Sequence, residues 1–249
     1  MNKASFRFYA ELNDFLPRDK RMAAFDYPFR DNPSVKDAIE ALGIPHTEVD
    51  MIVVNSKPAG FDHKLADGDN VSVYPVFESL NIGSVTLLRE KPLRKLKFIS
   101  DVHLGKLTRY LRLCGFDTIC YLQFNDNEII NSSLTEKRII LTRDKGLLKN
   151  RRVTHGYWIR SQYPDEQLVE VLKRFNLAKE IEPFTRCMNC NEVLADTNRQ
   201  YIKNRLLPLT RRYFRKFKIC PGCHNIYWNG SHYHKMKEFL RKLKKRLKE

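Results

Sequence analysis

The sequence predicts an α/β protein with more than one domain. Strand and helix patterns in residues 1–79 follow the order of a small β-grasp sheet packed on one helix. From residue 96, strands alternate with helices, which is typical of a parallel α/β sheet. Two C-x-x-C pairs near the C-terminus indicate a zinc-ribbon-like module with a basic helical tail. The predicted divisions are 1–79, a linker at 80–95, then 96–183 and 184–249.

The order predicted for the first domain is a strand, an optional second strand, a helix and two more strands. Residues 4–10 alternate apolar and polar side chains, as a half-buried strand does. A helix is expected over 34–42, where apolar residues have helical spacing; its first residue, a serine, can cap it, and Gly43 ends it. Residues 51–60 indicate a strand entering a turn, and 70–77 indicate a final strand.

The middle of the chain is predicted to be a parallel α/β domain that follows a linker without clear periodicity. The expected elements are a strand at 96–100, a helix from 104 that ends at Gly115, a strand at 118–122, a helix at 125–134 and a strand at 138–142. Strands that alternate with helices in this way form a parallel sheet.

Three aspartates, Asp101, Asp126 and Asp144, occur where predicted strands and helices meet. In a parallel α/β sheet, sites form beyond the carboxyl ends of the strands, so these carboxylates are expected to lie together. Mg²⁺ and Mn²⁺ prefer oxygen ligands, and a bound metal can activate water and clamp a scissile phosphate. We therefore predict a catalytic metal site at the three aspartates. Taken singly, Asp101 and Asp126 could instead be helix N-caps, and Asp144 a turn residue.

Basic side chains surround these aspartates. Lys106, Arg109 and Arg112 recur at intervals of three along a predicted helix. Arg143 and Lys145 flank the third aspartate, and Arg143 can hold a phosphate through a bidentate guanidinium fork. We predict substrate contacts at all five positions. A solvated helix face is the alternative for the first three.

Four cysteines form two C-x-x-C pairs: Cys187 with Cys190, and Cys220 with Cys223. Without a secretion signal, metal binding explains them better than disulfides do, and four thiolates suit Zn²⁺ in a closed structural site. A redox dithiol is the alternative, but it needs a thioredoxin-like context that the sequence lacks. Between the pairs, the segment TRRYFRKFK combines basic and aromatic residues that suit phosphate contact and base stacking.

The net charge of +16 is unevenly distributed along the chain. Residues 1–80 carry 9 Lys and Arg against 13 Asp and Glu, whereas residues 81–249 carry 36 against 16. Clustered basic residues favour a polyanion partner, and a basic surface without a partner is the alternative. The tail at 234–249 has the spacing of an amphipathic helix, for which contact with RNA, with a membrane surface or with a neighbouring domain is open.

Two features of the sequence bear on location. No apolar run approaches the roughly 18 residues that a membrane helix needs. The N-terminal residues MNKASFRFYAELND lack a secretory apolar region. Both features predict a cytoplasmic protein without a membrane partner.

The segments SVKDAIEALGIP and VVNSKPAGFDHKLADGDNVSVYPVF resemble the ubiquitin-like sulfur-carrier domains. The resemblance covers about 75 residues and implies a β-grasp fold. Sulfur carriers end in an exposed Gly-Gly, whereas this chain continues through PVFESLNIGSV. A docking or stabilising role is therefore expected rather than sulfur transfer, and the protein partner of this domain is left undefined.

The segment FISDVHLGKLTRYLRLCGFDT, followed by LTRDKGLL and the two C-x-x-C pairs, resembles the mutator-seven C-terminal RNase domain, a PIN-like nuclease family. The resemblance runs from about Lys97 to His234, and proteins of that family often carry an N-terminal ubiquitin-like domain. It implies a PIN-like fold and Mg²⁺- or Mn²⁺-dependent cleavage of RNA, including structured RNA such as tRNA or rRNA. By position, the three aspartates match the family's acidic residues. Asp117 matches a further motif position, where the alternative to a catalytic role is a turn residue.

These features together predict a metal-dependent ribonuclease, with catalytic Mg²⁺ or Mn²⁺ at the aspartates and structural zinc at the cysteines. One alternative is a non-catalytic, zinc-containing RNA-binding adaptor whose aspartates only cap helices. A second is a sulfur-transfer accessory protein, which the absence of a terminal Gly-Gly disfavours.

Overall fold

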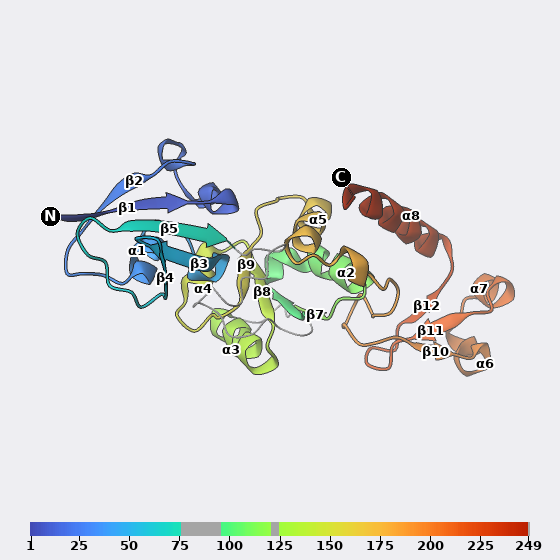
Figure 1. Cartoon of the computed structure of the whole chain (residues 1–249). Coiled ribbons are helices and arrows are strands. Elements are labelled where there is room, and N and C mark those ends of the chain that lie inside the picture. The colour runs from blue at the N-terminus through green and yellow to red at the C-terminus, as the bar shows by residue number, and fades with distance from the viewer. Residues whose placement is uncertain (76–95, 121–124, 249) are drawn as a thin grey trace. The chain divides into compact units, whose positions relative to one another are not determined.

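The computed structural model describes residues 1–75, 96–120 and 125–248 (Figure 1). The chain divides into two compact units, each made of two segments. The first joins Met1–Lys95 with Asn125–Trp158, and the second joins Leu96–Phe124 with Ile159–Glu249. The predicted linker at 80–95 lies outside the described residues. Part of the predicted parallel domain therefore forms a unit with the N-terminal sheet.

A five-stranded sheet in the order β2-β1-β5-β3-β4 forms the N-terminal part of the first unit. Its strands are β1 (Asn2–Phe8), β2 (Phe25–Phe29), β3 (Val49–Val54), β4 (Lys57–Ala59) and β5 (Asn70–Pro75). The neighbours β1 and β5 are parallel, and all other neighbours are antiparallel. This mixed sheet has the strand order expected of a β-grasp domain, and the short β4 extends what the sequence indicated as a turn.

One helix, α1 (Val35–Ala41), packs on this sheet. Ser34 caps it, because the serine Oγ accepts a hydrogen bond from the Asp37 backbone N–H at 3.1 Å. Gly43, with a φ of +98°, takes the left-handed conformation that commonly ends a helix. The apolar side of the helix packs with Phe6 and Phe8 in the core. The predicted helix and both of its boundaries are confirmed.

The second segment of the first unit alternates helices and strands. Its elements are α3 (Asp126–Glu136), β8 (Ile139–Thr142), α4 (Lys145–Lys149) and β9 (Gly156–Trp158). The strands β8 and β9 pair in parallel. Only α3 and β8 were expected from the sequence.

This segment packs directly on the N-terminal domain. The Trp158 backbone N–H donates to Glu48 Oε1 at 2.6 Å, and the indole ring lies 4.8 Å from the Phe15 ring between centroids. His46 Nε2 lies 2.8 Å from the Val153 carbonyl oxygen. His46 and Glu48 are both buried, and both belong to a short 3-10 helix, His46–Glu48, that directly precedes β3. The N-terminal domain thus helps to hold β9 in place.

The second unit begins with a parallel strand pair and its helices. Its α/β part contains β6 (Phe98–Ser100), α2 (Gly105–Leu113), β7 (Thr118–Ile119) and α5 (Pro164–Arg174). The strands β6 and β7 are parallel, and α2 lies against α5. At Gly115, φ is +98° and a Cβ atom would lie 2.4 Å from the Glu182 carbonyl oxygen, so only glycine can end α2 in this way. Parallel pairing in both units agrees with the predicted parallel α/β class.

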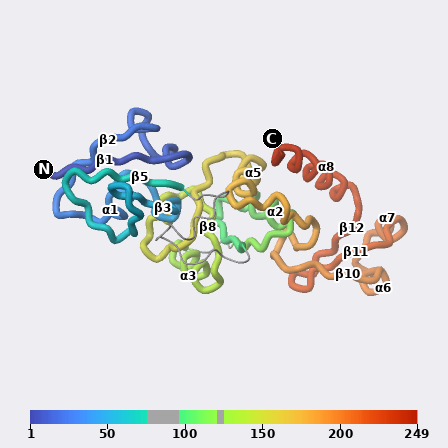
Figure 2. Tube along the Cα trace, viewed as in Figure 1, coloured from blue at the N-terminus to red at the C-terminus, as the bar shows by residue number. Residues whose placement is uncertain are grey.

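The C-terminal part of the second unit holds the four cysteines. An antiparallel sheet in the order β10-β11-β12 lies beside three helices. The elements are β10 (Ala195–Thr197), α6 (Arg199–Ile202), α7 (Pro208–Tyr213), β11 (Phe217–Ile219), β12 (Ile226–Trp228) and α8 (Ser231–Arg246). Figure 2 shows α8 running from this sheet back towards α5. There Arg246 Nη1, on α8, lies 3.1 Å from Asp165 Oδ2, on α5. The predicted tail helix is confirmed.

Candidate active site and metal centre

The four cysteine thiols of the C-terminal part converge on one point. Their sulfur atoms all lie within 4.8 Å of one another. Cys187 Sγ lies 3.5 Å from Cys223 Sγ, and Cys190 Sγ lies 3.2 Å from Cys220 Sγ. Thiolates bound to one zinc at about 2.3 Å would be roughly 3.8 Å apart, so these sulfurs could hold a metal such as zinc with small adjustments. Within residues 1–75, 96–120 and 125–248, no other group of three or more His, Cys, Asp or Glu has this reach.

Both C-x-x-C pairs use the same backbone turn. The residue after the second cysteine is left-handed in each, with φ of +76° at Asn191 and +59° at His224. The Asn191 N–H donates to the Cys187 carbonyl at 3.0 Å, and the His224 N–H donates to the Cys220 carbonyl at 3.0 Å. This repeated turn brings both thiols of a pair to the same side of the chain. We call the two turns the first and the second knuckle.

Ionisation differs among the thiols. Burial opposes ionisation of Cys187, but the Tyr227 hydroxyl at 3.0 Å and the backbone N–H groups of Cys190 and Asn189 outweigh it, and its pKa falls to about 6. Burial raises the pKa of Cys190 to about 12. A metal ion would have to displace the proton of such a thiol, so metal affinity at this centre depends on pH. Tyr227 belongs to no motif of the sequence, and only its place shortly after the second knuckle could have suggested its contact with Cys187.

Arg112 supports the first knuckle from α2. Only 6% of its surface is exposed. Its Nη1 donates to the carbonyl oxygens of Asn189 at 2.6 Å and Met188 at 3.2 Å. Its Nε donates to the Thr118 carbonyl at 2.7 Å. The guanidinium is therefore engaged within the fold, which differs from the substrate contact expected of it.

Asp117 also contacts residues of the first knuckle and its flank. Its Oδ1 accepts from Asn191 Nδ2 at 2.8 Å, and its Oδ2 lies 3.6 Å from Arg186 Nη2. Asn191 Oδ1 in turn accepts from the Thr118 backbone N–H at 3.0 Å. Asp117 thus ties the turn between α2 and β7 to the first knuckle. This arrangement matches the turn role that the sequence left open beside a catalytic one.

Asp101 and Asp144 both stand at the start of helical segments. Asp101 directly follows β6, and its Oδ1 accepts from the His103 N–H at 2.8 Å. Asp144 follows β8 by two residues, and its Oδ1 accepts from the Gly146 N–H at 2.7 Å. Both carboxylates therefore cap a helical turn. A carboxylate has further lone pairs beyond the one that a capping bond uses, so capping leaves metal ligation open.

Asp126 is the first residue of α3 and does not cap it. Asn125 is the N-cap, and its side chain and that of Glu128 form a reciprocal capping box. Asp126 is exposed in the first turn, where a negative charge favours the helix. Asp126 and Asp144 belong to the first unit and Asp101 to the second. Their joint ligation of one cation stays a prediction.

Comparison with protein families identifies the chain. A family model described as the Mut7-C RNase domain matches residues 96–240, which is more than half of the chain. The chain belongs to the Mut7-C RNase family. A second model, Mut7-C ubiquitin, matches residues 1–81. No curated protein and no solved structure matches the chain.

The Mut7-C match extends across the α/β part, the cysteine centre and most of α8. It includes the three aspartates and all four cysteines, so these features belong to one family domain. The match supports an enzyme of the ribonuclease type, and the N-terminal match supports the ubiquitin-like assignment. None of the helices in the described part of the chain combines the length and the apolar composition that a membrane span requires.

The basic residues expected to contact substrate in the Mut7-C domain have different surroundings. Lys106, Arg109 and Arg143 are exposed. Lys145 is half-buried, and its Nζ lies 4.7 Å from the Phe15 ring centroid and 4.0 Å from that of Trp158. Lys145 therefore makes cation–π contacts that link α4 to the ubiquitin-like domain.

Proposed function

We propose that this protein is a metal-dependent ribonuclease that hydrolyses RNA phosphodiester bonds. A divalent cation, Mg²⁺ or Mn²⁺, would be held by Asp101, Asp126 and Asp144. The match to the Mut7-C RNase domain over residues 96–240 carries the proposal. The half-exposed or exposed position of each aspartate at the start of a helical segment supports it, since oxygen ligands at such places can reach a hard cation.

The bound cation and the basic side chains would have different roles in cleavage. A cation bound there would offset the charge of the scissile phosphate and lower the pKa of the attacking water. Arg143, exposed next to Asp144, presents a guanidinium that can grip a phosphate with two hydrogen bonds. Lys106 and Arg109, exposed along α2, would attract the RNA backbone. Structured RNA such as tRNA or rRNA is the substrate class we propose.

We also propose that the cysteine centre holds structural Zn²⁺. Four cysteine ligands complete a tetrahedral shell and leave no open position for substrate. Reduced thiols of this kind fit a cytoplasmic location, which we propose as well. Zinc would then fix the first knuckle, to which α2 and β7 are tied through Arg112 and Asp117.

Asn substitutions at the aspartates test the proposal. Asp101→Asn and Asp144→Asn keep the oxygen that caps each helical segment but remove the charge that a hard cation needs. We expect RNA cleavage to fall by about a hundredfold or more in each variant, as for other groups that stabilise charge in the transition state. RNA binding and the melting temperature should stay close to those of the wild type.

Asp19→Asn is the matched control. Asp19 is exposed in the ubiquitin-like domain, so the same chemical change there should leave cleavage unaltered. The capping bonds of Asp101 and Asp144 favour a second candidate, a non-catalytic RNA-binding adaptor. Near wild-type cleavage by both well-folded aspartate variants would remove the carboxylate site. A wild-type protein that binds RNA but never cleaves it would establish the adaptor.

A further inference from the structure

The connection between β10 and β11 is far longer than the sheet requires. These strands are antiparallel neighbours, and such strands are usually joined by about two to five residues. Here residues 198–216 intervene and form α6 and α7; we call them the α6–α7 insert. A small apolar core of Ile202, Leu206 and Phe217 fixes the insert on the sheet. The insert is thus a folded addition whose purpose lies outside the cysteine centre.

The charge of the insert is of one sign. Residues 198–216 contain seven Lys and Arg and no Asp or Glu. Like charges held this close repel one another and destabilise the folded state. An anionic partner would remove that repulsion and release the counterions of its own phosphates.

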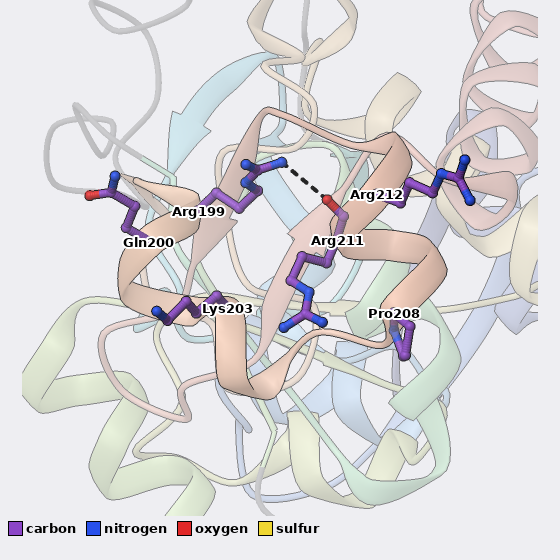
Figure 3. A pocket seen from close by; sticks show the side chains of 6 residues that line it. All are labelled: Arg199, Gln200, Lys203, Pro208, Arg211 and Arg212. Carbon is purple, nitrogen blue, oxygen red and sulfur yellow. Dashed lines mark hydrogen bonds between the residues drawn. The ribbon is translucent and has the colours of Figure 1, made fainter.

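The two helices of the insert enclose a basic hollow of about 360 Å³. Its lining residues are Arg199, Gln200, Lys203, Pro208, Arg211 and Arg212. Figure 3 shows Arg211 extending into the space between the helices, while Arg199 reaches across to α7. Arg199 Nη1 donates to the Arg211 carbonyl oxygen at 3.2 Å, so one arginine braces the hollow while the other points into it.

Each helix of the insert also displays a tyrosine. Tyr201 on α6 is 86% exposed, and Tyr213 on α7 is 66% exposed. The Arg212 guanidinium carbon lies 5.7 Å from the centroid of the Tyr213 ring. Exposed aromatic rings beside clustered arginines are the combination that proteins use to stack unpaired bases and hold the backbone next to them.

We infer that the α6–α7 insert binds a single-stranded segment of RNA. Its phosphates would enter the hollow at Lys203 and Arg211, and bases would stack on Tyr201 or Tyr213. This inference rests on the proposed function for the identity of RNA as substrate, but it places a binding site apart from the three aspartates. An anionic membrane surface would also meet the charge, yet a flat surface makes no use of a hollow.

Charge-neutral substitutions test the inference in the full-length chain. The double variant Lys203→Gln/Arg211→Gln removes two exposed charges at the hollow, and Lys242→Gln/Lys245→Gln removes two exposed charges from α8 as the matched control. Binding of a fluorescent, unstructured RNA oligonucleotide is measured by anisotropy without added Mg²⁺ or Mn²⁺. We expect the first variant to bind about tenfold more weakly and its salt slope to fall by about 1.4, with much smaller changes in the control.

The tyrosine variant separates base stacking from charge. Tyr201→Ala should weaken binding of the single strand by about tenfold and leave binding of duplex RNA unchanged, because paired bases cannot stack on the ring. Equal affinities of the two double variants would overturn the inference, since net charge alone would then explain binding. The inference would also be overturned if Lys203→Gln/Arg211→Gln lost affinity for phosphatidylserine vesicles but kept its affinity for RNA.

The binding assay also stands apart from the nuclease assay. RNA binding that depends on the hollow, in a protein that never cleaves, would refute the ribonuclease and leave this inference intact. Normal cleavage with unchanged binding by the hollow variant would refute this inference and leave the ribonuclease intact.

Discussion

Arg109 and Arg112 lie one turn apart on α2 and have opposite environments. Arg109 is exposed, whereas Arg112 is buried and donates to three backbone carbonyls. Their spacing in the sequence assigned them the same role, because periodicity identifies a face of a helix but not what covers it. The cover of Arg112 comes from Met188 and Asn189, more than seventy residues later in the chain.

Substitution of the two arginines should separate these roles. Arg112→Ala leaves three carbonyls of the fold without their charged donor, so the free energy of unfolding should fall by about 3 kcal/mol. Arg109→Ala should unfold at nearly the wild-type denaturant concentration. Urea unfolding followed by circular dichroism measures both. An Arg112→Ala protein with wild-type stability and weakened RNA binding would show that Arg112 contacts the substrate and does not support the fold.

The candidate site was predictable only residue by residue. The four cysteines were found from their spacing, because metal ligands on tight turns have a local signature. Capping by Asp101 was among the alternatives, since caps also depend on a few neighbouring residues. The support by Asp117, Asn191 and Tyr227 depends on contacts between distant segments, which no local pattern records.

At the scale of elements, those with strong local signals were predicted and those held by distant contacts were not. The helices α1 and α2 have glycines at their ends that a sequence pattern reveals. The helix α4 and the strand β9 are only five and three residues long, too short to show a period. Both lie against the ubiquitin-like domain, through Lys145 on Phe15 and through Trp158 on Glu48.

Loss of the Phe15 ring should therefore loosen α4 and β9 as well as the domain that contains it. Phe15 is buried, and its replacement by alanine costs about 3 kcal/mol or more. In Phe15→Ala, amide exchange should rise over residues 145–158, as followed by mass spectrometry. Tyr27→Ala is the control, since Tyr27 packs on Phe6 in the same core with ring centroids 5.5 Å apart. Unchanged exchange at 145–158 in Phe15→Ala would show that the contact does not hold this segment.

At the scale of the whole molecule, the compact units cross the divisions that the sequence predicted. Residues 125–158 form a unit with the ubiquitin-like domain, and the cysteine centre forms a unit with β6, α2 and β7. Local composition cannot reveal that residues 96–124 and 125–158 belong to different units, because it describes neighbours in sequence and not contacts in space. Charge was nevertheless informative: residues 185–249 carry 17 Lys and Arg against 4 Asp and Glu, and they contain the α6–α7 insert.

Return of Mn²⁺ to metal-depleted protein tests whether RNA cleavage needs a divalent cation besides zinc. The protein is freed of Mg²⁺ and Mn²⁺ under conditions in which elemental analysis still finds about one zinc per chain. RNA cleavage is then followed as Mn²⁺ is added. We expect no cleavage at the start and a saturable rise with Mn²⁺ while the zinc content stays constant. Full cleavage before any Mn²⁺ is added, or none at any concentration by protein that binds the RNA, would contradict it.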